Sequence, residues 1–281
     1  MSTLQWFAIF LAASTSLVRA PRFLTWGSLI VGYGIAFMLG HLGLPAAIVL
    51  ALLGGTGFIL TRKTQPLYRW IGHIVFVIIA IALFQHWIPG FHNLRVIHAE
   101  RFTPDAAPFT MYLNFDKPLI GFWLLLVFPW IRPKHKLSVV AGSAAVALTL
   151  TCAVCLAIAL HTGFVKWEPK WPHNGWLWAL DNLLLVTFAE EALFRGYIQG
   201  GIVRSLKQRP YAQWVGLFVA TVLFGLAHFE GGIQLVALAW IAGLGYGLAY
   251  RFGGLQSAML THFGLNLVQF GLFTYPMIAH G

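Results

Sequence analysis

Long apolar runs alternate with short polar segments along almost the whole chain. A helix needs about 17–25 mostly apolar residues to cross a hydrocarbon layer ~30 Å thick, so runs of roughly this length indicate membrane-spanning helices. The pattern predicts an all-α polytopic transmembrane helix bundle of about eight to ten spans, because three of the runs are short. The candidate spans are residues 3–18, 23–40, 45–60, 70–88, 118–131, 137–160, 176–203, 211–229, 233–250 and 254–275.

Basic side chains gather in every second connection between the predicted spans. These connections hold twelve basic residues and no acidic one, whereas the alternate connections hold five of each sign. Loops rich in Lys and Arg stay in the cytoplasm, so the first set is expected there and both termini on the other side. The short loops are typical of a multi-pass protein of a bacterial inner membrane, where we expect this one. The twelve are Arg19, Arg22, Arg62, Lys63, Arg69, Arg132, Lys134, Lys136, Arg204, Lys207, Arg209 and Arg251.

The composition agrees with this organisation and changes the interpretation of the net charge. Hydrophobic residues make up 59% of the 281 residues and charged residues 9%, against roughly 45–50% and about 25% in an ordinary globular protein. These values exclude a soluble fold and a disordered chain, and two Cys residues exclude a disulfide-rich secreted domain. The formal net charge of +10 follows from the topology, and no nucleic-acid-binding motif accompanies it. We therefore expect the lipid bilayer as a partner, and no nucleic acid.

Ionisable residues inside an apolar span need a reason, because placing a charge in the membrane is energetically costly. The seventh span holds Glu190, Glu191 and Arg195 within the sequence FAEEALFRG. Glu191 and Arg195 are four residues apart and share a helix face, so they are expected to form an ion pair. Glu190 points about 100° away from Glu191 on a regular helix. It is therefore expected to be the carboxylate that is left free for chemistry.

Further polar residues lie in the eighth and tenth spans. The sequence FGLAH places Phe224 and His228 four residues apart at the end of the eighth span. The tenth span carries His262 and Asn266, which are also four residues apart and share one helix face. Together with Glu190, these residues supply a base, two groups for proton transfer or metal binding, and an amide donor.

Three motifs, EExxxR, FxxxH and HxxxN, stand in this order on successive predicted helices. All three are intact: Glu190-Glu191-x-x-x-Arg195, Phe224-x-x-x-His228 and His262-x-x-x-Asn266. In these motifs the chain resembles the CAAX prenyl protease and bacteriocin-processing (CPBP) family of intramembrane glutamic endopeptidases. The resemblance covers roughly residues 176–275, so we expect a CPBP-like catalytic transmembrane core over residues 161–281. Residues 1–160 show no such motif and are expected to form an N-terminal transmembrane region of unassigned role.

The resemblance implies a peptide hydrolase with its catalytic site inside the membrane. In the family the first Glu of EExxxR activates a water for attack on a peptide bond, a role that passes to Glu190. His228 would orient that water or assist the proton transfer, while His262 and Asn266 would donate hydrogen bonds to the oxyanion of the tetrahedral intermediate. The expected function is an intramembrane endopeptidase acting on a peptide or membrane-protein substrate. The supporting residues would be Glu191, Arg195 and Phe224.

A metal ion is the main alternative for the chemistry. Glu190, His228 and His262 could make a two-His, one-carboxylate Zn²⁺ site with an open position for water. However, the chain has no HExxH pair, and Glu190 as a ligand would not also be an obvious free base. We therefore favour metal-free catalysis by Glu190, without a cofactor, and keep Zn²⁺ as the alternative.

Other functions and two further features stay open at this point. A proton- or ion-coupled transporter would also use buried Glu, His and Arg side chains, although the chain shows no inverted repeat. A non-catalytic membrane scaffold or immunity protein is the other alternative, and the intact motifs argue against it. The aromatic-rich connection 89–117 either folds back on the membrane surface or provides an access route for substrate. Gly243 and Gly247 form a small-xxx-small pair that predicts close helix packing.

Overall fold

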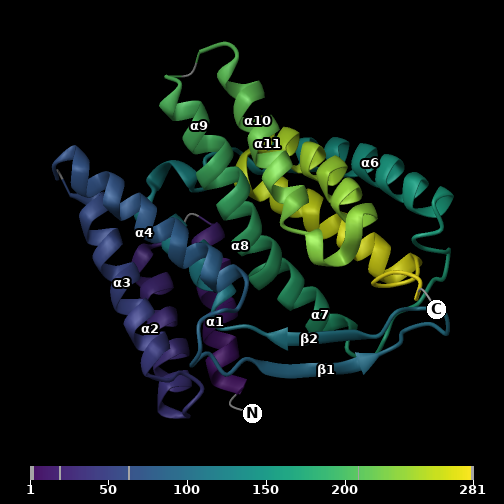
Figure 1. The fold of residues 1–281 in the computed structure, drawn as a ribbon, viewed down its shortest axis with the longest axis horizontal. Helices are drawn as coiled ribbons and strands as arrows, with labels where there is room; N and C mark the ends of the chain where they lie inside the picture. Colours follow the sequence, from purple (N-terminus) through teal and green to yellow (C-terminus); the bar gives the residue numbers. More distant parts are fainter. Residues whose placement is uncertain (1–2, 19, 63, 208, 280–281) are drawn as a thin grey trace.

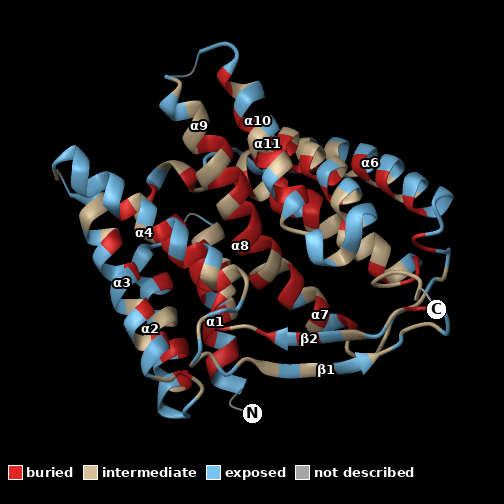
Figure 2. Ribbon diagram, viewed as in Figure 1, coloured by how far each residue is buried: buried red, intermediate tan, exposed pale blue. Residues whose placement is uncertain are grey.

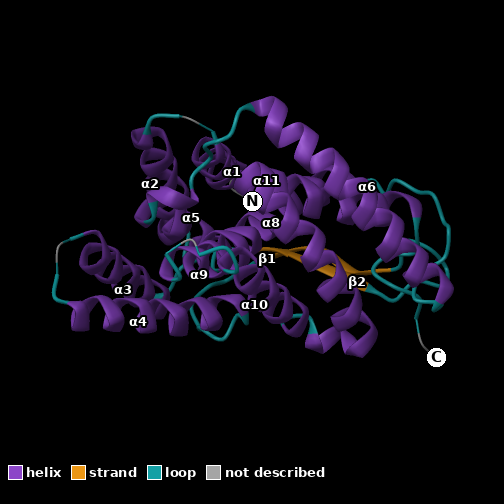
Figure 3. Cartoon of the chain, turned by 90° about the horizontal axis from the view of Figure 1, so that it is seen from above, coloured by secondary structure: helices purple, strands orange, loops and turns teal. Residues whose placement is uncertain are grey.

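The chain folds into a bundle of helices with one β-hairpin along its side (Figures 1 and 3). The computed structural model describes residues 3–18, 20–62, 64–207 and 209–279. The helices of the N-terminal region follow the predicted apolar runs, with ends within a few residues of the predicted ones. They are α1 (Thr3–Leu17), α2 (Arg22–Met38), α3 (Leu44–Thr61), α4 (Pro66–Phe84), α5 (Lys117–Val127) and α6 (Leu137–His161).

The predicted seventh span is one continuous helical segment whose winding changes along its length. Two stretches are π-helical, with hydrogen bonds that reach one residue further than in an α-helix. The regular helix expected for this span is therefore wrong at these stretches, and such wide turns are frequent at functional sites. In chain order the segments are α7 (Gly175–Asp181), π-helical Asn182–Val186, α8 (Thr187–Glu191), π-helical Ala192–Gln199 and α9 (Gly200–Ser205).

The last two helices are α10 (Ala212–Leu226) and α11 (Gly232–Leu272), joined through a short 3-10 turn. α11 contains both of the last two predicted spans. It is bent at Gly254, where φ is 74° and ψ is −167°. Glycine adopts a positive φ at little cost because it has no Cβ. The rings of Tyr246 and His262 stack across this point with centroids 4.4 Å apart, whereas 16 residues of continuous helix would separate them by about 24 Å. The chain therefore turns back at Gly254, and the two predicted spans are two helices of α11 that lie side by side.

Four of the described helical segments are long and apolar enough to cross a membrane, namely α3, α4, α6 and the segment Phe229–Leu272 that contains α11. α1, α2, α5 and α10 are shorter apolar helices. Large exposed apolar side chains, such as Phe58, Trp70 and Ile78, suit contact with lipid. The protein is thus an integral membrane protein with the predicted all-α architecture, while the number of spans stays a prediction.

The hairpin was not predicted by the apolar pattern. β1 (Leu94–Glu100) pairs antiparallel with β2 (Phe109–Leu113), within the connection 89–117. Ile97 and Met111 are buried in a cluster with Trp178 of α7. Because two strands alone are at best marginally stable, this packing onto the helices holds the hairpin in place.

The hydrophobic core crosses the border between the N-terminal region and the C-terminal part of the chain. Its largest cluster combines side chains of α1–α5 with Phe188 of α8 and Met259 of α11. Figure 2 shows many buried positions along α8 and many exposed ones on α3 and α4. α5 approaches α8 so closely that a Cβ on Gly121 would lie 2.5 Å from Cε1 of Phe188. This close packing brings the first residue of α5 to the carboxylates of α8.

Candidate active site

Glu190 forms an ion pair that the sequence did not indicate. Nζ of Lys117, the first residue of α5, lies 2.6 Å from Oε1 of Glu190, and both side chains are largely buried. The expectation that Glu190 is unpaired is therefore wrong. Lys117 lies in a predicted connection rather than in a span, but its long side chain reaches inward because α5 packs directly on α8. The interaction compensates the charge of a carboxylate that would otherwise be costly to bury.

A small hydrogen-bond network fixes the position of Lys117. Asp116 caps the start of α5 by accepting a hydrogen bond from the Lys117 backbone N–H at 2.8 Å. The Asp116 carboxylate also contacts Nδ1 of His86 at 2.7 Å and accepts a hydrogen bond from Nδ2 of Asn93 at 3.2 Å. These contacts tie the start of α5 to the segment that leads into β1.

The second carboxylate, Glu191, joins two of the three motifs. Its Oε1 accepts a hydrogen bond from Nη1 of Arg195 at 3.2 Å and lies 2.8 Å from Nδ1 of His262. The predicted ion pair between Glu191 and Arg195 is confirmed, and both side chains are fully buried. Arg195 also lies over the ring of Phe224, with Cζ 4.3 Å from the ring centroid. Phe224 therefore supports the site by covering the guanidinium group.

Two glycines of α11 let this helix contact the segment that carries the carboxylates. Nη2 of Arg195 donates to the Gly243 carbonyl at 3.1 Å, and Nε2 of Gln199 donates to the Gly247 carbonyl at 3.0 Å. A Cβ on Gly247 would lie 2.3 Å from Cδ1 of Leu217. The close packing predicted for this small-xxx-small pair is confirmed, and the bare backbone also supplies two acceptors.

His262 and Asn266 face the same neighbouring helical segment, as their spacing predicts. Nδ2 of Asn266 donates to Oδ1 of Asn182 at 3.1 Å, one π-helical stretch before Glu190. His262 stacks on Tyr246, with ring centroids 4.4 Å apart and planes 14° from parallel. Its Nε2 lies 4.0 Å from Oε2 of Glu190, so His262 sits between the two carboxylates.

His228 lies just beyond the end of α10. Its Nδ1 is 2.8 Å from the Phe224 carbonyl oxygen. Since a carbonyl only accepts hydrogen bonds, Nδ1 carries the proton and Nε2 of the neutral ring keeps its lone pair. His228 is close enough to Glu190 for an electrostatic interaction. It can therefore exchange a proton through Nε2.

A cavity of about 100 Å³ lies beside these groups. His228, His262 and Asn266 line it, together with mostly apolar side chains from α6, α10 and α11. Glu190 is not one of the lining residues and instead contacts the site through His262 and Lys117. The structure thus brings all four predicted catalytic residues into one neighbourhood, with three of them on one cavity.

The fit of a metal ion can be judged from the donor atoms. Among the described residues, no three His, Cys, Asp or Glu side chains are grouped as a metal site would require. The contacts of His262 Nδ1 with Glu191 and of Glu190 Oε1 with Lys117 leave Nε2 and Oε2 without these partners, and a carboxylate on the second ring nitrogen is usual for a metal-binding histidine, so the grouping of the side chains decides. In this arrangement Glu190, His228 and His262 do not form a Zn²⁺ ligand set.

Residues 172–268 match the family model for type II CAAX prenyl endopeptidases of the Rce1-like kind. This match supports a likeness of the segment to the CPBP/CAAX protease family. The matched segment contains all three motifs and agrees with the resemblance drawn from them. No curated protein and no solved structure matches the chain.

Residues 172–268, which we name the CAAX-protease segment after the family model that they match, do not contain every residue of the site. Lys117 lies well outside it, in the N-terminal region. A lysine next to the start of an apolar run is an ordinary feature of a membrane helix, where it is expected at the interface. The sequence therefore held no signal that would separate Lys117 from the other basic residues in the connections.

Proposed function

We propose that the protein is an intramembrane endopeptidase, located in a bacterial inner membrane, that hydrolyses a peptide bond of a peptide or membrane-protein substrate. The observation that carries this proposal is the position of Glu190. One of its carboxylate oxygens is held by Lys117, and the other faces Nε2 of His262 at 4.0 Å. A fixed carboxylate beside a histidine is suited to activating water. The match of residues 172–268 to a family model of endopeptidases supports the same class of reaction.

In the proposed reaction, Oε2 of Glu190 takes a proton from a water, whose oxygen bonds to the carbonyl carbon of the substrate. His262, when it carries both ring protons, donates from Nδ1 to Glu191 and from Nε2 to the oxyanion. Asn266 donates one amide hydrogen to Asn182 and has a second one for the oxyanion. The carbon–nitrogen bond then breaks, and the proton held by Glu190 passes to the leaving nitrogen, with His228 as the relay.

The remaining polar groups keep this arrangement in place. Lys117 and Arg195 each compensate one of two neighbouring carboxylates, which would otherwise repel each other in a medium of low dielectric constant. Glu191 also orients the ring of His262. We propose that Lys117, Glu191, Arg195 and Phe224 position the reacting groups and do not touch the substrate.

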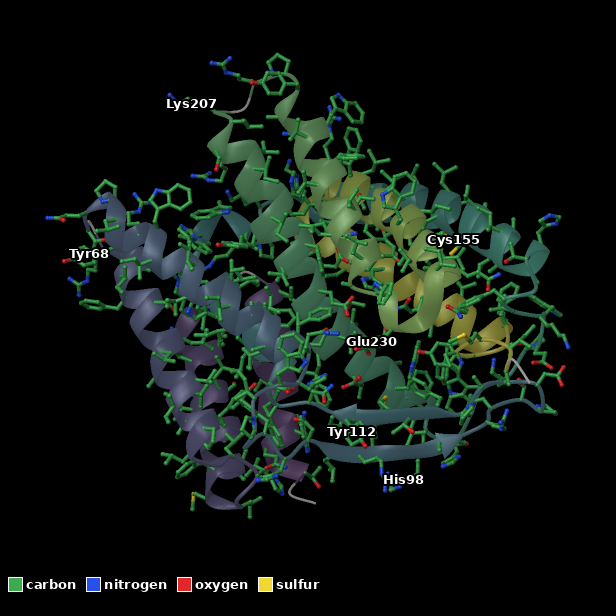
Figure 4. All side chains as sticks on the ribbon, viewed as in Figure 1. Tyr68, His98, Tyr112, Cys155, Lys207 and Glu230 are labelled. Atoms are coloured by element: carbon green, nitrogen blue, oxygen red, sulfur yellow. The ribbon has the colours of Figure 1, made fainter. Side chains whose placement is uncertain are left out.

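Proteomics of peptide termini in membranes tests the proposal without a known substrate. Cells expressing wild-type protein, Glu190→Gln or Glu230→Gln are compared for N-terminal and C-terminal peptides of membrane proteins. Glu230 is an exposed carboxylate outside the site (Figure 4), so Glu230→Gln makes the same chemical change without an expected effect. Glu190→Gln is expected to slow cleavage by about 10²–10⁴-fold, the usual contribution of a general base.

A set of termini that disappears with Glu190→Gln and persists with Glu230→Gln would support the proposal. If Glu190→Gln accumulates to the wild-type level and every terminus is retained, the proposed protease activity is wrong. A non-catalytic scaffold or a transporter would then be the better hypothesis. The role of a metal is tested on the same cleavage with purified protein. Activity is expected to survive EDTA treatment, and loss of activity that Zn²⁺ restores would contradict a metal-free reaction.

A further inference from the structure

A cleft of about 760 Å³ lies between the hairpin and the helix that carries Glu190. Figure 1 shows β2 on the side of the hairpin that faces α7. On the helix side the cleft is lined by Trp178, Asp181, Asn182 and Val186. It is several times larger than the cavity beside His228 and is large enough for a peptide segment.

The cleft is bordered by the backbone edge of β2. Its lining includes the consecutive residues Phe109, Thr110, Met111 and Tyr112. Successive side chains of a strand point to opposite faces of a sheet, so four consecutive residues on one cleft indicate that the strand presents its edge there. In the described part of the chain the sheet contains β1 and β2 alone. The N–H and C=O groups on the far edge of β2 are therefore available to another strand.

The floor of the cleft is connected to the proposed catalytic residues. Asn182 accepts the hydrogen bond from Asn266. Asp181 is buried, and one of its carboxylate oxygens has no hydrogen-bond partner among the described residues. Lys117, the partner of Glu190, is near enough to Asp181 to interact electrostatically. A segment lying along β2 would thus be close to the residues that we propose to cleave it.

We propose that the cleft binds the substrate as an extended polypeptide segment that adds to β2 as a third strand. This inference rests on the proposed function and specifies how the substrate is held. Main-chain hydrogen bonds to an exposed edge recognise the backbone of a peptide, and alternate side chains then enter the neighbouring pockets. In a helix each carbonyl is engaged in an internal hydrogen bond, whereas an extended segment presents its peptide bonds to an attacking water.

Backbone methylation of the substrate tests this inference on the wild-type protein. The probe is a synthetic peptide of about a dozen residues spanning a cleavage site that Glu190→Gln membranes no longer produce. Each amide nitrogen is methylated in turn, which removes one donor. Strand addition predicts a rise in KM of about fivefold at every second position, the effect of one lost hydrogen bond, with kcat much less changed. The absence of an alternating pattern would overturn the inference.

Substitutions on the two strands give a second measurement. Thr110→Trp places a large side chain at the cleft, whereas His98→Trp adds the same side chain to an exposed position of β1 that does not line the cleft (Figure 4). Because Thr110 Oγ1 accepts a hydrogen bond from the Ala99 N–H, Thr110→Val measures the loss of the hydroxyl alone. A tryptophan at position 110 would keep the substrate backbone away from β2 and prevent more than one backbone hydrogen bond. We therefore expect kcat/KM of Thr110→Trp to be about tenfold lower than that of Thr110→Val. His98→Trp is expected to remain within about twofold of wild type.

The outcomes separate this inference from the proposed function. If Glu190→Gln leaves all termini in place, the protease proposal fails and the strand docking fails with it. If Glu190→Gln abolishes cleavage but neither the methylated peptides nor Thr110→Trp show the expected loss, strand docking alone is wrong. The methylation series remains decisive even if Thr110→Trp does not fold, because it uses the unaltered protein.

Discussion

The N-terminal region and the CAAX-protease segment contribute to one site in different ways. The segment 172–268 supplies charged and polar groups at a spacing of four residues, so that partners share one helix face. The N-terminal region supplies Lys117 and one wall of the cleft, which come from elements without a motif. The motifs record residues four apart on one helix, and packing then joins them across helices, as it does for Glu191 and His262. They do not record Lys117, which packing brings to Glu190 from outside the matched segment.

The two ion pairs show this difference most directly. Glu191 and Arg195 belong to one helical segment and are fully buried. Lys117 and Glu190 belong to different regions of the chain and keep slight exposure. The first pair therefore depends on local geometry, while the second depends on the contact between α5 and α8. Substitutions in each pair sharpen this contrast.

The largest effect on stability is expected from Glu191→Leu. It leaves the guanidinium of Arg195 buried without its carboxylate, which costs about 3–5 kcal/mol of unfolding free energy. The double variant Glu191→Leu/Arg195→Met removes both charges and is expected to regain most of that loss. Unfolding of the detergent-solubilised proteins, followed by tryptophan fluorescence, measures both values. A single variant as stable as wild type would show that the pair does not compensate Arg195.

A smaller loss is expected from Lys117→Met, because the pair it breaks is slightly exposed. Glu190 would be left without its cation, and we expect a loss of about 2–3 kcal/mol in unfolding free energy together with reduced cleavage. Lys117→Met/Glu190→Gln removes both charges and should recover stability while remaining inactive. Lys117→Arg keeps the charge and serves as the control. Wild-type stability and cleavage in Lys117→Met would mean that the N-terminal region contributes nothing essential to the site.

The smallest effect concerns packing alone. Gly247→Ala places a methyl group 2.3 Å from Cδ1 of Leu217, and relieving such a contact costs about 1–3 kcal/mol. Gly34→Ala in α2 is the matched control, because a Cβ there meets no atom within 4 Å. We expect Gly247→Ala to lower the unfolding temperature and Gly34→Ala to leave it unchanged or slightly raised. Equal unfolding temperatures would show that α11 can move away from its neighbours without loss.

Much of the architecture was predictable because it depends on local periodicity. Apolar runs located the helices, and the four-residue spacing identified Glu191 with Arg195 and placed His262 and Asn266 on one face. The break at Gly254 was predicted as the end of one span and the start of the next, and the two helices on either side of it lie against each other. The hairpin was not predicted, since its stability comes from contacts with α7 rather than from its own sequence pattern. The π-helical stretches on either side of Glu190 were not predicted either, because the pattern of apolar residues does not distinguish them from an α-helix.

By itself, the sequence determined that this is a helical membrane protein in which residues 172–268 carry two carboxylates within an apolar run, and two histidines and an asparagine at motif spacing. Helix periodicity, the scarcity of charge and the motif spacing are all properties of neighbouring residues. Only the tertiary structure decided that Lys117 pairs with Glu190 and that the edge of β2 borders a cleft. Both depend on the packing of segments far apart in the chain, where no spacing rule connects the partners.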